Sequence, residues 1–112
     1  MAGKRPPRDR LFDTRWVHVF EEDTAAGAVF RAEDSDVPLS RRPRERLELE
    51  RDGSARLYVA GADDRLVDRP ATWAEEGGAL VVRARDGGVE ARIVERSPER
   101  LVVRLGRARR GD

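Results

Sequence analysis

Cysteine is absent from this chain of 112 residues, and histidine occurs once, as His18. The lack of cysteine excludes disulfide bonds, thiolate metal ligands and a cysteine nucleophile. No stretch approaches the ~20 apolar residues that a membrane-spanning helix needs, and no apolar run follows the charged N-terminus. We therefore expect a cytoplasmic protein with no membrane partner. No pattern in the sequence indicates a metal site or a cofactor.

Aromatic residues are scarce, at 5% of the chain, and Lys4 is the only lysine. The remaining basic residues are arginines, and the 23 basic residues nearly balance the 22 acidic ones. Acidic and basic residues are interleaved along the chain. Nucleic-acid binding requires stacking aromatics or a one-sided basic face. The composition therefore gives no expectation of a nucleic-acid partner.

Apolar residues alternate with polar ones in short segments separated by turn residues. The clearest example places Leu47 and Leu49 on one face, Asp52-Gly53 in a turn, and Leu57 on the next segment. Alternation interrupted by Asp-Gly is a strong hairpin signal. Further segments of the same kind are separated by turns, and helical periodicity is not sustained anywhere. The expected strands lie at about 15–20, 27–32, 44–51, 54–60, 71–75, 79–85, 89–95 and 101–105.

These segments predict an all-β fold, an antiparallel up-and-down meander of about eight short strands closing into a small barrel. We expect the barrel to span residues 13–106, preceded by a disordered basic arm at 1–12 and followed by a basic tail at 107–112. The irregular segment 33–43 is long for so small a domain, and we interpret it as a functional lid or a mobile connection. The residues expected to face the interior are Trp16, Phe20, Phe30, Leu47, Leu49, Leu57, Val59, Trp73, Leu80, Val82, Ile93, Leu101, Val103 and Leu105.

Three stretches resemble the small lipocalin-like (calycin-type) domains of bacteria: "LELERDGSARLY", "ATWAEEGGALVVR" and "ARIVERSPERLVVRL". Trp16 near the start of the first strand is similar to the tryptophan that plugs one end of the barrel in that family. The resemblance implies a lipocalin-like barrel. It also implies that the chain is related to binders of small apolar molecules and to domains without a known role, and fold alone does not give function.

The stretch "HVFEEDT" contains the best candidate site. If the first strand continues through it, the period of two places His18, Phe20 and Glu22 on the face of Trp16. His18 and Glu22 then form a polar pair at one mouth of the barrel, where Trp73 is a further candidate for the pocket wall. Histidine with a carboxylate is able to contact a polar ligand, bind a metal or transfer a proton. A hydrogen-bonded histidine at the edge of the core is the alternative, and no metal site is predicted.

A second cluster, Arg41 to Arg46, holds four arginines. Guanidinium groups suit anions such as phosphate and carboxylate. The same arginines can instead pair with neighbouring acidic residues such as Glu21 and Glu22. The sequence leaves this choice open and favours pairing within the chain.

The functional expectation is a non-enzymatic barrel that binds a small apolar or amphipathic ligand at its mouth. One alternative is a structural or interaction module with a filled barrel, which contacts a protein partner or a second copy. A weaker alternative is an enzyme that uses His18 and Glu22. No catalytic residue is assigned.

Overall fold

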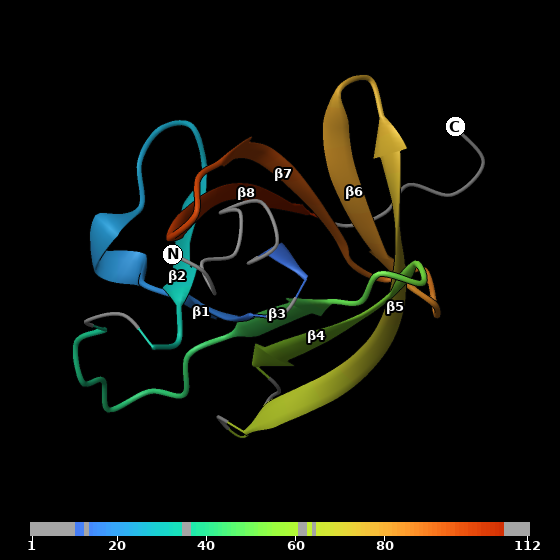
Figure 1. Cartoon of the computed structure of the whole chain (residues 1–112). Helices are drawn as coiled ribbons and strands as arrows, with labels where there is room; N and C mark the ends of the chain where they lie inside the picture. Colours follow the sequence, from blue (N-terminus) through green and yellow to red (C-terminus); the bar gives the residue numbers. More distant parts are fainter. Residues whose placement is uncertain (1–10, 13, 35–36, 61–62, 64, 107–112) are drawn as a thin grey trace, which may run out of the picture.

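The computed structural model describes residues 11–12, 14–34, 37–60, 63 and 65–106, and these form an all-β barrel (Figure 1). A short 3-10 turn, η2, lies between the first two strands. The elements are β1 (Arg15–His18), η2 (Phe20–Glu22), β2 (Ala28–Ala32), β3 (Arg46–Leu49), β4 (Ser54–Ala60), β5 (Leu66–Glu76), β6 (Ala79–Ala84), β7 (Glu90–Arg96) and β8 (Arg100–Gly106).

All neighbouring strands pair antiparallel, and the order β1-β2-β8-β7-β6-β5-β4-β3 closes because β1 also pairs with β3. The predicted antiparallel meander of about eight strands closing into a barrel is confirmed. Strands β3 to β8 follow one another around the wall in sequence order. The β1–β2 hairpin completes the wall with β1 beside β3 and β2 beside β8.

This closure explains the long irregular segment between β2 and β3. Both strands pair antiparallel with β1, so they run in the same direction on its two sides. The chain must therefore return along the length of β1 before β3 begins. Backbone hydrogen bonds mark the two ends of this return, from Glu33 N to Arg15 O (2.8 Å) and from His18 N to Glu45 O (2.9 Å). Residues 33–34 and 37–45 thus belong to a crossover connection, visible as the wide teal-to-green loop in Figure 1.

The interior is one apolar cluster built from the inward faces of the strands. Cross-strand pairs share a face, so alternation along each strand carries the same side chains inward around the wall. Most of the predicted inward residues lie in this cluster, with Val59 and Trp73 partly buried against it. Two predicted residues lie outside this cluster. Phe20 lies in η2, and Leu105 keeps its inward direction but is 43% exposed near the end of β8.

Strand β5 begins earlier than its sequence predicts, at Leu66 instead of Ala71. Pro70 obscured this, because proline is rare inside strands. Pro70 pairs with Arg56 of β4, and its carbonyl accepts a hydrogen bond from Arg85 N at 2.9 Å. A strand residue points its nitrogen and carbonyl to the same side, so the missing N–H faces away from β4 and removes no bond of that ladder.

The N-terminal residues Leu11 and Phe12 pack on the barrel, although the predicted boundary assigned them to the arm. Leu11 is buried in the core cluster, and Phe12 lies 5.3 Å from Trp73 between ring centroids. They lie at the end where β1 begins, which we call the Arg15 end. The other end, where β1 finishes, is the His18 end. Residues 1–10 and the tail at 107–112 lie outside the described residues.

Gly27 is expected to tolerate no side chain. Its φ is +155°, and an added Cβ would lie 2.7 Å from the backbone oxygen of Val103. We expect Gly27→Ala to lower the free energy of unfolding by about 1–2 kcal/mol, since β2 and β8 must separate to admit the methyl group. Gly106→Ala is the matched control, because nothing lies within 4 Å of its added Cβ. Equal urea midpoints for the two variants would contradict the close approach.

Candidate functional site

His18 is the last residue of β1, and it occupies the inward face at the His18 end. Its cross-strand partner is Phe30, and the two rings stack with centroids 5.0 Å apart and an interplanar angle of 18°. After Val19 the chain turns into η2. β1 therefore ends at His18, whereas the alternation in the sequence predicts a strand that continues to Phe20.

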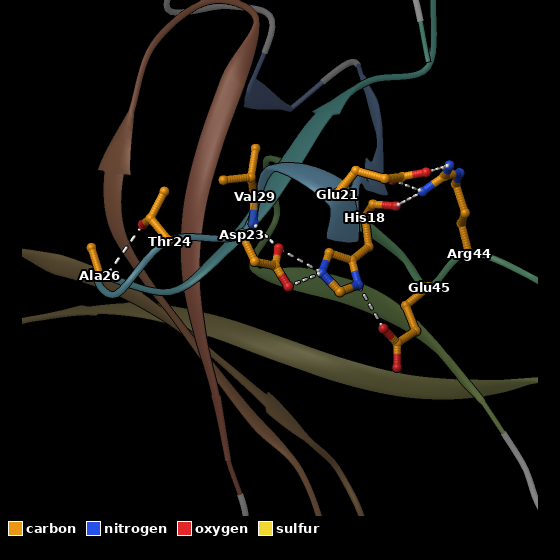
Figure 2. Close-up of polar contacts among 8 residues, drawn as sticks. All are labelled: His18, Glu21, Asp23, Thr24, Ala26, Val29, Arg44 and Glu45. Atoms are coloured by element: carbon orange, nitrogen blue, oxygen red, sulfur yellow. Dashed lines mark hydrogen bonds and ion pairs between the residues drawn. The ribbon is translucent and has the colours of Figure 1, made fainter. Parts of the chain in front are cut away.

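Both ring nitrogens of His18 contact carboxylates (Figure 2). Nδ1 lies 2.9 Å from Glu45 Oε1, and Nε2 lies 3.0 and 3.1 Å from the two carboxylate oxygens of Asp23. Carboxylates only accept hydrogen bonds, so both contacts are satisfied together only by the imidazolium form. Burial by itself lowers the pKa of His18, but the hydrogen bonds to Glu45 and Asp23 outweigh it and raise the pKa above 6.5.

Glu22 does not accompany His18, whereas Phe20 stays beside it, with the two ring centroids 6.2 Å apart in an edge-to-face arrangement. Glu22 Oε1 accepts a hydrogen bond from Arg31 Nε at 2.8 Å. The Phe20 ring lies under the guanidinium carbons of Arg42 and Arg44, each 4.8 Å from its centroid. The expected pairing of His18 with Glu22 is therefore replaced by contacts with Asp23 and Glu45. The reason is the 3-10 turn, which breaks the period of two.

Arg44 anchors the crossover connection against η2, as Figure 2 shows in part. It is the one buried charged residue found in the described ranges, with 9% of its surface exposed. Its two Nη atoms donate to the two oxygens of Glu21 at 2.9 and 2.8 Å, and Nη1 also donates to His18 O at 3.0 Å. Nη2 and Nε both donate to Pro38 O. For this member of the arginine cluster, the predicted pairing with a neighbouring acid is confirmed.

The two tryptophans are held toward the Arg15 end. Trp16 is fully buried, and its indole N–H donates to Leu11 O at 3.2 Å. The indole N–H of Trp73 donates to Glu50 O at 2.6 Å, beside the β3–β4 turn. Both indole N–H groups therefore already donate to backbone carbonyls, and neither tryptophan lines the barrel mouth beside His18.

At the His18 end, inward-facing apolar side chains stay in contact with solvent. Val67 pairs with Val59, which packs on the core, and Leu105 pairs with the buried Ala91. Partners in a ladder share a face, so Val67 and Leu105 both point inward. Each is nevertheless 43% exposed. The His18 end thus combines exposed inward apolar surface with the polar cluster around His18.

The cluster around His18 is poorly suited to a metal ion. Glu45 and Asp23 contact opposite nitrogens of the same ring, so the two carboxylates and one nitrogen do not converge on a single point. Among the residues that the structure describes, no group of three or more potential protein ligands gathers for a metal.

The described part of the chain includes no helix with the length and apolar character needed to cross a membrane.

Sequence reasoning missed Asp23 and Glu45 for different reasons. Extending the alternation of β3 backwards from Leu47 and Leu49 places Glu45 on the inward face, so a signal for it was present. For Asp23 the alternation misleads, because a strand that continued from His18 without interruption would point Asp23 to the outer face. Its true position depends on η2, for which the sequence carries no clear signal.

Comparisons with protein-family models, with curated proteins and with solved structures found no match for this chain. The closed eight-stranded antiparallel barrel is consistent with a lipocalin-like fold.

Proposed function

We propose that this protein is a lipocalin-like barrel that binds a small apolar or amphipathic ligand at the His18 end. The observation that supports this most directly is the exposure of Val67 and Leu105, which lie on the inward face yet are each 43% exposed. Inward apolar surface in contact with water is a favourable place for an apolar ligand, because binding removes that surface from water. The opposite end is occupied by Leu11 and Phe12.

The polar groups at this end supply orientation for an amphipathic ligand. The side chain of His18 is 12% exposed, and those of Asp23 and Glu45 are 39% and 32% exposed. In this proposal the apolar part of the ligand contacts Val67 and Leu105, and its polar part faces this cluster. Of the residues predicted from the sequence, His18 keeps a role in this proposal. Trp16, Phe20, Glu22 and Trp73 contribute to the scaffold around it.

Binding is tested by amide NMR shifts during titration with dodecanoate, dodecylamine and 8-anilinonaphthalene-1-sulfonate. We expect at least one probe to shift the amides of Val59, Val67 and Leu105 in a saturable manner. Val67→Arg is expected to weaken that binding at least about tenfold by placing a charge in the apolar contact. Val94→Arg is the matched control, since Val94 is 37% exposed and lies toward the Arg15 end of β7. No saturable shift with any probe would refute the proposal.

A filled barrel that serves as an interaction module is the second candidate. The interior supports it, because Trp16, Leu47 and Leu101 are almost completely buried in one continuous cluster. The outer wall carries cross-strand ion pairs such as Arg15–Glu48 and Arg56–Asp68, at 2.8 and 2.7 Å. Leu39 on the crossover connection is 99% exposed. Saturable probe binding at the His18 end separates the two candidates in favour of the first.

A further inference from the structure

His18 joins two segments that are distant in the sequence. Asp23 belongs to the connection between β1 and β2, residues 19–27, and Glu45 immediately precedes β3. One ring therefore links the β1–β2 connection to the start of β3 through its two nitrogens. A neutral imidazole has one N–H donor and one acceptor, so neither tautomer is able to donate to both carboxylates.

We propose that His18 is a pH-sensitive latch, which fixes the β1–β2 connection at the His18 end when the ring is protonated and loosens it when the proton is lost. The proposal goes beyond ligand binding and does not depend on it. Its basis is the double carboxylate contact of a partly buried ring, whose side chain is 12% exposed.

The groups around the ring determine which contact gives way. From the β1–β2 connection the ring faces Asp23 and, through space, Glu21; from the β3 side it faces Glu45. β2 contributes Phe30, which does not titrate, and Arg44 donates to the backbone carbonyl of His18. His18 N also donates to Glu45 O, which holds Glu45 by its backbone. The backbone N–H of Asp23 donates to Phe20 O at 3.2 Å, inside the β1–β2 connection and not to His18, so Asp23 is tied to the ring only through its side chain. The contact with Asp23 is therefore the one that loosens.

The consequence of losing this contact is local. Asp23 Oδ1 also accepts a hydrogen bond from Val29 N at 2.9 Å. Movement of Asp23 therefore weakens this bond at the start of strand β2. The connection keeps two further ion pairs that do not involve His18, Glu21–Arg44 and Glu22–Arg31, each at 2.8 Å. Loosening therefore affects the region of Asp23 and Val29 and leaves the barrel closed.

The direction of the pH dependence follows from the raised pKa of His18. The stabilising contact is fully present below the unfolded-state pKa of about 6.5. It is lost as the pH rises through the higher folded-state value. The latch is thus closed in mildly acidic solution and opens on the alkaline side of 6.5.

The single histidine makes the test direct, because the ring gives one set of NMR signals. Ring ¹⁵N shifts and the exchange protection factor of Val29 N–H are followed from about pH 5 to about pH 10. The expected result is protonation of both nitrogens below a midpoint above 6.5. Above it, we expect the Val29 protection factor to fall about tenfold, the effect of one hydrogen bond to a charged group.

Two variants and a matched control complete the test. Asp23→Asn keeps an oxygen for Val29 N–H but removes the charge, so it should lower the midpoint and abolish the pH dependence of Val29 protection. Glu45→Gln should also lower the midpoint. Glu22→Gln changes a carboxylate of the same connection that pairs with Arg31, and it should leave both readouts unchanged. A wild-type midpoint at or below 6.5, or a Val29 protection factor constant through the midpoint, would overturn the latch.

Discussion

Replacing Trp16 with alanine is expected to lower the free energy of unfolding by about 3–5 kcal/mol, the range for truncating a large buried aromatic residue. Trp16 is 0% exposed and is the largest fully buried side chain of the described core. It pairs with Ala32 on one side and Leu47 on the other, so the cavity would open across the seam that closes the barrel. Urea denaturation followed by circular dichroism at constant pH measures the loss.

Two controls separate the contributions of Trp16. Trp16→Phe keeps most of the buried ring and removes the donor to Leu11 O, so its cost should be clearly smaller than that of alanine. Trp73→Ala truncates a tryptophan that is only partly buried, and it should also cost less. If Trp73→Ala proves as damaging as Trp16→Ala, the closing role assigned to Trp16 is wrong.

The strands of the barrel wall were predictable because the signals that define them, alternation and turn residues, lie close together in the sequence. Alternation around Leu47 and Leu57, with Asp52-Gly53 between them, defines a hairpin whatever the rest of the chain does. The position of the β1–β2 hairpin was not predictable in this way. Whether β1 or β2 lies beside β3 is a choice between two long-range pairings, and residues 33–45 are compatible with either until the whole barrel is closed.

The site was predictable only as far as the strand periodicity holds. That periodicity places His18 inward beside Trp16, and the structure agrees. Its partners depend on the direction of the chain after Val19, where a 3-10 turn replaces the strand. A turn of three residues is too short to be stable by itself, and here the pairing of Glu21 with Arg44 connects it to the rest of the structure.

Arg44→Ala is expected to lower the free energy of unfolding by about 2 kcal/mol. The guanidinium connects three segments at once, through Glu21, His18 O and Pro38 O. Its removal leaves these acceptors without their donor in a poorly solvated region. Because the side chain of Glu21 is 41% exposed, water replaces part of what is lost, so the cost stays below that of an isolated buried charge.

Arg42→Ala is the matched control for the contact with Phe20. Both guanidinium carbons lie 4.8 Å from the Phe20 centroid, but Arg42 is exposed and Arg44 is buried. A cation–π contact at an exposed site contributes about 0.5–1 kcal/mol, so Arg42→Ala should cost no more than that. Arg44→Lys keeps the charge but not the bidentate fork, and it should fall between the two. Equal costs for Arg42→Ala and Arg44→Ala would mean that Arg44 contributes only its contact with Phe20, and that the crossover connection is held in place by other contacts.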